Sequence, residues 1–175
     1  MSNGASWNVT LDETIGTYAA GVFNQTGGVN TAGGQVRIGP NSGSSGIYNL
    51  TGGTLNAGGI DLVRGTFNAA GGTLNTANFL QEGGDITGTL AGQAAYTYSG
   101  GTFFGRLINT GTVVLNADFT AGNGLENRSL FDVAGNRNVT LNGAGFSGNG
   151  TTTLSGTLTA SVEHIGESLN ASFTQ

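Results

Sequence analysis

Residues 48–56 read YNLTGGTLN, and residues 67–75 read FNAAGGTLN. Both stretches place an aromatic residue four positions before a Gly-Gly pair, and both continue after the pair with Thr, Leu and Asn. Self-similarity at fixed internal offsets is the sequence signature of repeat proteins, in which each unit buries its apolar side against the next. These two stretches therefore predict a repeat fold.

The aromatic residue followed by a Gly-Gly pair occurs five times between residues 23 and 101, with spacings of 25, 19, 12 and 17 residues between the aromatic residues. A constant motif at variable spacing is expected when strands are fixed and the loops between them vary in length. We therefore expect one Gly-Gly corner in each coil of a stack. The predicted repeat residues are Phe23, Gly27, Gly28, Tyr48, Gly52, Gly53, Phe67, Gly71, Gly72, Phe79, Gly83, Gly84, Tyr96, Gly100 and Gly101.

The C-terminal half keeps a period but uses different corners. Asn109-Thr-Gly111 precedes TVVLN, Asn127-Arg-Ser129 precedes LFDV, and Gly148-Asn-Gly150 precedes TTTLSGTLT. Each corner introduces a short run in which side chains alternate in character, which is typical of strands of about 4–6 residues.

A short strand with one apolar face cannot bury that face alone, whereas coils stacked about 4.8 Å apart pair each strand with the next and form a continuous core. Gly suits the corners, Thr suits outward strand positions, and Asn amides can form ladders along the stack. The sequence predicts an all-β parallel β-helix, a β-solenoid, of about seven coils of ~20 residues. A β-sandwich or an up-and-down barrel is the alternative, but it does not explain the fixed offsets.

One domain is expected over residues 1–175. Residues 1–17, which include Trp7, are predicted to form an N-terminal cap or docking strand, residues 18–160 the coils, and residues 161–175 a C-terminal cap or docking strand. The segment around Pro40, GPNSGSSG, is the expected outward loop in the longest interval between repeats.

The composition excludes several classes of protein. The chain has 34 Gly, 24 Thr and 19 Asn, but only one Pro and no Cys. These numbers argue against collagen, a helical protein and a disulfide or cysteine–zinc scaffold. Intrinsic disorder is the main competitor, but the low content of charged residues, 9%, argues against it. Five arginines and a net charge of −5 provide no basic surface for nucleic acid.

The phrases IYNLTGGTLNAGG, GTFNAAGGTLN and YTYSGGTFFGRLINTGTVVLN resemble the Gly/Asn/Thr-rich repeats of bacterial exported β-solenoid proteins. Autotransporter passenger domains and surface proteins with a PEP-CTERM sorting signal carry such repeats. The resemblance covers roughly residues 20–160 and implies a parallel β-helix, secretion, and a structural, adhesive or matrix role. The chain departs from the full proteins because it contains no signal peptide, sorting helix or barrel domain, and its N-terminus, MSNGASWNVTLDE, matches no signal peptide.

The sequence contains few residues suited to catalysis. His164 lies between Glu163 and Glu167, but no second His supports a metal site or a general base, so a solvated strand or end cap is the favoured interpretation. Asp61 and Glu82 are 21 residues apart, about one coil, and are the best pair for glycoside cleavage. We predict no catalytic site, no cofactor and no metal site.

The primary functional prediction is a non-enzymatic, extracellular building block of a bacterial surface layer, filament or adhesive matrix. Its expected partners are other copies of itself or other matrix components, including glycans, and no part of this segment is expected to insert into a membrane. The first alternative is a carbohydrate-binding or carbohydrate-cleaving module. Its aromatic platforms would be Trp7, Tyr18, Tyr48, Tyr96 or Tyr98, beside Asp61, Glu82 or Asp85.

The second alternative is an ice-binding solenoid. Thr151 and Thr153, and then Thr157 and Thr159, have the two-residue spacing of one strand face. Ordinary outward threonine on strands is the favoured interpretation, because the pairs do not recur at one position over many coils.

Overall fold

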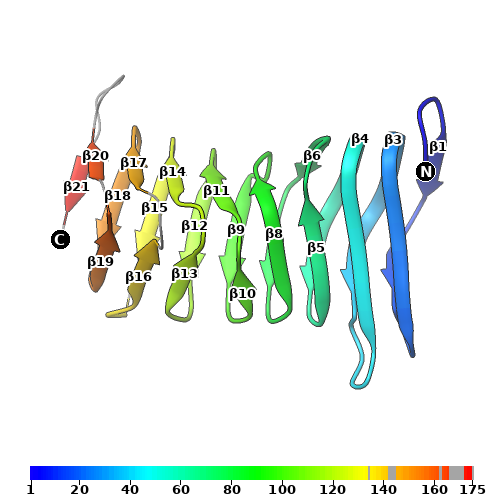
Figure 1. Ribbon diagram of the computed structural model, residues 1–175, viewed down its shortest axis with the longest axis horizontal. Helices are drawn as coiled ribbons and strands as arrows, with labels where there is room; N and C mark the ends of the chain where they lie inside the picture. Colours follow the sequence, from blue (N-terminus) through cyan, green and yellow to red (C-terminus); the bar gives the residue numbers. More distant parts are fainter. Residues whose placement is uncertain (134, 142–144, 162, 166–171, 175) are drawn as a thin grey trace.

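The computed structural model describes residues 1–133, 135–141, 145–161, 163–165 and 172–174. The described residues form strands and turns without a helix, and all strand pairings among them are parallel. The strands stack into a β-solenoid of about eight turns. Figure 1 shows the turns following one another along a rod with the two termini at opposite ends. The predicted fold class is confirmed, with slightly more turns than the seven expected.

Each turn has three faces. The first face contains β1 (Ser6–Val9), β6 (Thr73–Thr76), β11 (Arg106–Asn109), β14 (Leu125–Asn127), β17 (Phe146–Gly148) and β20 (Glu163–Ile165). The second contains β2 (Glu13–Ile15), β7 (Phe79–Gln81), β9 (Ala95–Tyr98), β12 (Thr112–Leu115), β15 (Leu130–Val133), β18 (Thr151–Leu154) and β21 (Ser172–Thr174). The third contains β5 (Gly65–Ala69), β8 (Asp85–Leu90), β10 (Thr102–Phe103), β13 (Phe119–Ala121), β16 (Asn138–Leu141) and β19 (Thr157–Ala160). The long strands β3 (Ala20–Ile38) and β4 (Ser45–Leu62) each run through the third, first and second faces in turn.

The core lies inside the rod and is filled by every second residue of the strands. In β6 and β18 exposed and buried residues alternate strictly. Aromatic rings join the faces within and between turns: the ring centroids of Tyr48 and Phe67 are 5.6 Å apart, and those of Phe67 and Phe79 are 5.2 Å apart. The alternation therefore has the physical cause expected from the sequence, since only inward positions are removed from water.

The five Gly-Gly pairs lie where the chain bends. In each pair the second glycine has a positive φ, between 68° at Gly84 and 96° at Gly101. A Cβ atom added to Gly53 would lie 2.4 Å from the carbonyl oxygen of Gly28, one turn away. These corners therefore combine a left-handed backbone with close stacking of neighbouring turns, and both favour glycine.

The prediction of one motif copy per turn is wrong between Phe67 and Phe79. Phe23, Tyr48 and Phe67 are consecutive partners on the third face, whereas Phe79 and Tyr96 are partners on the second face. Phe67 and Phe79 thus belong to the same turn, and the interval of 12 residues moves the motif from one corner to another. A three-sided coil has three corners with the same chemistry, so a local motif specifies a corner without specifying which one.

Asparagine forms ladders both outside and inside the rod. On the outside, Asn49 Nδ2 donates to Asn24 Oδ1 at 2.7 Å and Asn75 Nδ2 donates to Asn56 Oδ1 at 2.9 Å. Inside, Asn109 Nδ2 donates to Asn127 Oδ1 at 2.8 Å, and Asn127 Nδ2 donates to the Thr151 carbonyl at 3.0 Å. The inner ladder lies at the corners with the C-terminal motifs, where buried amides satisfy the backbone at each bend.

Replacing Asn127 with alanine is expected to lower the free energy of unfolding by about 2 kcal/mol, because its partners would remain buried without hydrogen bonds. Asn75→Ala is the matched control: its side chain is exposed, and its loss is expected to cost about 0.5 kcal/mol or less. Urea unfolding monitored by circular dichroism measures both values. Equal losses in the two variants would refute a structural role for the inner ladder.

The loop between β3 and β4, residues 39–44, extends beyond the neighbouring turns (Figure 1). It contains Pro40, and Asn41 Nδ2 anchors it to the Thr17 carbonyl at 2.8 Å. This is the outward loop expected in the longest repeat interval.

Candidate docking surface at the N-terminal end

The N-terminal end of the rod has strand edges without partners among the described residues. β1 and β2, which lie in the predicted cap segment, each pair on one side only, with β3. On the third face the first turn is partly covered, because Thr26 N donates to the Met1 carbonyl at 2.8 Å and the Met1 amino group donates to the Asn24 carbonyl. Open edges of this kind are templates for pairing with another chain.

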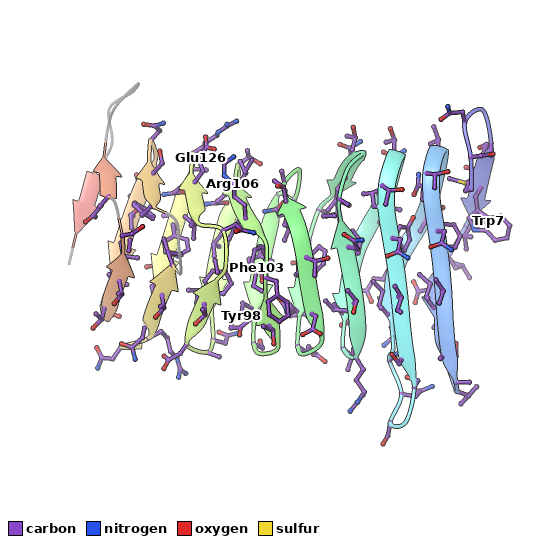
Figure 2. All side chains as sticks on the ribbon, in the orientation of Figure 1. Trp7, Tyr98, Phe103, Arg106 and Glu126 are labelled. Carbon is purple, nitrogen blue, oxygen red and sulfur yellow. The ribbon has the colours of Figure 1, made fainter. Side chains whose placement is uncertain are left out.

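The same end exposes apolar side chains. Trp7 pairs in register with the buried Asn30, so it occupies an inward position, yet 52% of it is exposed because no turn covers it. Figure 2 shows Trp7 at the extreme end of the rod. Most large exposed apolar side chains of the described chain belong to this end: Trp7, Leu11, Tyr18, Val22 and Val29. A concentration of this kind marks an interaction surface more than an ordinary surface does.

Two hollows open at this end, with volumes of about 440 Å³ and 250 Å³. Trp7, Val22 and Phe23 line both of them. The larger is completed by Met1, Ala5, Ser6 and Asn24, and the smaller by Glu13, Thr14, Ile15, Gly16 and Gly21. The end of the core is therefore open rather than sealed by a cap.

A buried polar cluster lies directly behind the smaller hollow. Asn30 Nδ2 donates to Glu13 Oε2 at 2.8 Å and to the Tyr48 hydroxyl at 2.9 Å, and this hydroxyl donates to Gln25 Oε1 at 2.6 Å. Glu13 is only 8% exposed. Burial raises the pKa of its carboxyl group, and the hydrogen bond from Asn30 only partly opposes this shift. Burial also raises the pKa of the Tyr48 hydroxyl, so this group stays neutral.

The C-terminal end also has open edges within the described residues. β19, β20 and β21 pair on one side only, with β16, β17 and β18. Leu158 of β19 is partly buried against the last part of the core. In the part of the chain that the structure describes, both ends of the rod therefore end in unpaired parallel strands.

The predicted aromatic platforms for glycans are mostly inside the protein. Tyr48 and Tyr96 are fully buried and Tyr98 is 5% exposed, so the prediction is wrong for these three residues. The hydroxyls of Tyr96 and Tyr98 bind Gln81 Oε1 at 2.6 Å and the Gly101 carbonyl at 2.8 Å. Only Trp7 and Tyr18 are exposed. Aromatic residues at inward strand positions fill the solenoid because it is wide enough to hold stacked rings.

The predicted carboxylate pair is not brought together. Asp61 pairs with Leu80, not with Glu82, because the turn is 19 residues long at this point. Asp61 Oδ2 instead lies 3.7 Å from Arg37 Nε, while Asp85 is on the third face. The structure therefore gives no carboxylate-lined groove at these three residues.

The charges of the described surface form local pairs. Glu126 contacts Arg106 and Arg128, each at 2.5 Å, and Figure 2 shows Arg106 and Glu126 side by side on the first face. Exposed pairs of this kind contribute little to stability. Among the described residues no group of three or more His, Asp or Glu side chains is arranged to hold a metal ion.

Glu163 is exposed in β20. The side chain of His164 and the whole of Glu167 lie outside the described residues, and with them the predicted His164 cluster.

The threonines behave differently from the expectation. Thr120, Thr140 and Thr159 are consecutive partners on the third face, and Thr102 extends the column because the adjacent Phe103 pairs with Ala121. A threonine position thus recurs over several turns, contrary to the sequence interpretation. Beside it Asn138 pairs with Thr157, so no second threonine column completes a two-dimensional array. Thr152 is buried and accepts a hydrogen bond from Asn127.

The sequence analysis missed the polar cluster at Glu13. The signal was present in residues 13–15, Glu-Thr-Ile, because Glu13 and Ile15 lie on the same side of a strand. Ile15 belongs inside, so Glu13 must also point inside.

No helix of the described residues is long and apolar enough to span a membrane. Comparison of the chain with protein-family models, with curated proteins and with solved structures found no match.

Proposed function

We propose that this protein is a non-enzymatic structural rod that associates end to end and builds an extracellular bacterial layer, filament or matrix. The observation that carries the proposal is the N-terminal end, where unpaired parallel strands surround an open apolar core. Solenoid ends need a polar cap for solubility, and an end without one is suited to stacking. The repeat resemblance supports the extracellular location.

A second copy of the chain is the partner that fits this surface. The last turn of one copy presents parallel edges with the same three-sided arrangement that the second turn presents to the first. Head-to-tail contact preserves the parallel direction of the strands, and a heterologous contact of this kind propagates into an open filament.

The inward column at the start of the third face supports the same arrangement. It begins with Gly21, Gly46 and Gly65 and ends with Phe119, Val139 and Leu158. Within the rod, the register of β10 and β13 already places Phe119 next to Gly101 in this column. Head-to-tail stacking would place Leu158 of one copy next to Gly21 of the other, beside the 250 Å³ hollow.

Val22→Asp is expected to weaken association at least about tenfold, because it places a charge in the apolar end without a partner. Val114→Asp is the matched control, since Val114 is also exposed but lies on the side of the rod, in β12. Sedimentation velocity over a concentration series gives the association constants, and electron microscopy gives the particle length. The original chain should form rods that lengthen with concentration.

Two outcomes would overturn the proposal. One is a uniform monomer of the unmodified chain at high concentration, and the other is an equal effect of both substitutions. The extracellular location is tested separately, by surface labelling of the source cells with antibodies against the chain. Binding on a glycan array or thermal hysteresis in ice would favour the two alternative functions instead.

A further inference from the structure

Glu13 is a carboxyl group in an unusual position for a docking surface. Its register partner is the fully buried Val36, so its side chain points into the core of the first turn. Glu13 Oε2 accepts a hydrogen bond from Asn30, whereas Glu13 Oε1 is buried without a hydrogen-bond partner. Only the 250 Å³ hollow, lined also by Trp7, Ile15 and Phe23, separates it from the open end of the rod.

No positive charge compensates Glu13 among the described residues packed around it. Arg37 of β3 pairs with Thr14, on the opposite side of β2, and contacts Asp61. The neighbouring Asp12 accepts a hydrogen bond from the Gln35 backbone at 2.9 Å. The polar groups that face Glu13, Asn30 and Tyr48, are neutral.

The buried cluster lacks a donor and has a surplus of acceptors. Glu13 Oε1 and Asn30 Oδ1 are both buried without partners. An ionised carboxylate only accepts hydrogen bonds, whereas a protonated carboxyl group also donates one. Protonation of Glu13 is therefore the change that supplies the missing donor and removes the uncompensated charge at the same time.

A second copy docked on this end would exclude the remaining water from the hollow. The charged form of Glu13 would then lose its residual hydration without gaining a counter-ion, and this cost is larger than that of any other group at the surface. Glu163 of the incoming copy adds a negative charge to the junction: its register partner is the inward Phe146, so it occupies an inward position of the last turns. Both features oppose docking while Glu13 is ionised.

We infer that the N-terminal end accepts a second copy only when Glu13 is protonated, so that growth of the rod takes up one proton at each junction. This inference rests on the proposed end-to-end association and names its regulation. Rods elongate in acid and shorten as the pH rises. The direction agrees with the free chain, in which burial already raises the pKa of Glu13.

The test compares Glu13→Gln with Asp132→Asn, two variants with the same net charge. Asp132 is exposed on β15, on the side of the rod. The dissociation constant is measured by sedimentation between pH ~5 and ~8 for both variants and for the original chain. Above the pKa, each proton taken up makes the constant rise about tenfold per pH unit. We expect the slope of its logarithm against pH to fall by about one in Glu13→Gln and to stay unchanged in Asp132→Asn.

Glutamine keeps the acceptor for Asn30 and adds a donor, so the fold is expected to persist, as circular dichroism checks. A second measurement uses the original chain alone: the heat of dissociation is recorded in two buffers with different ionisation enthalpies. A difference between the two heats reports protons released when the rods dissociate.

The two hypotheses fail in different ways. A chain that remains monomeric at every pH contradicts the end-to-end association itself. Rods whose pH dependence is the same in Glu13→Gln as in the original chain, or whose heat of dissociation is independent of the buffer, leave the association intact and overturn the role of Glu13.

Discussion

Replacing Phe67 with alanine is expected to lower the free energy of unfolding by about 3–5 kcal/mol. Phe67 is fully buried, and its ring lies 5.6 Å from Tyr48 of the turn before and 5.2 Å from Phe79 of the same turn. The substitution removes contacts along the rod and across it and leaves a cavity, which neighbouring turns cannot close because their strands are fixed by backbone pairing. Urea unfolding measures the loss.

Phe104→Ala is the matched control for this prediction. Phe104 is the same residue type but is 55% exposed, and its truncation is expected to cost about 1 kcal/mol or less. Similar losses in the two variants would contradict the aromatic stack as a main source of stability. A change in the denaturant dependence of Phe67→Ala without a lower midpoint would point to partial unfolding of turns instead.

Replacing Gly53 with alanine is expected to cost about 2–4 kcal/mol for two separate reasons. Its φ of 80° is unfavourable for a residue with a Cβ atom, which contributes about 1–2 kcal/mol. The Cβ atom would also lie 2.4 Å from the carbonyl oxygen of Gly28, so the turns must move apart at that corner, which adds about 1–3 kcal/mol.

Gly43→Ala separates these two contributions. Gly43 has nearly the same φ, 77°, but an added Cβ atom would have no atom within 4 Å. Its cost is therefore expected to be limited to the backbone term of about 1–2 kcal/mol. Thermal and urea unfolding of both variants give the difference, and equal costs would show that close stacking at the Gly-Gly corners is unimportant.

The candidate docking surface was only partly predictable. The sequence placed a docking or capping strand in residues 1–17 and singled out Trp7, and in the structure Trp7 lies at the open end. It did not reveal the cluster of Glu13, Asn30, Tyr48 and Gln25, whose members are up to 35 residues apart in sequence and meet only because successive turns stack. Tyr48 and Tyr96 were assigned to the surface as one alternative because sequence alone does not say how wide the core is.

The sequence by itself determined the architecture. Alternating side chains, glycine pairs at fixed offsets from an aromatic residue, and asparagine at corners are local properties, and each has one consistent use in a stacked parallel coil. The assignment of each corner to a face was decided only by the tertiary structure, since Phe67 and Phe79 carry the same motif but lie on different faces of one turn. The open end was decided there too, because burial in a solenoid comes from the neighbouring turn. Trp7 and Glu13 occupy inward positions like those of the core, and they differ from it because no turn covers them.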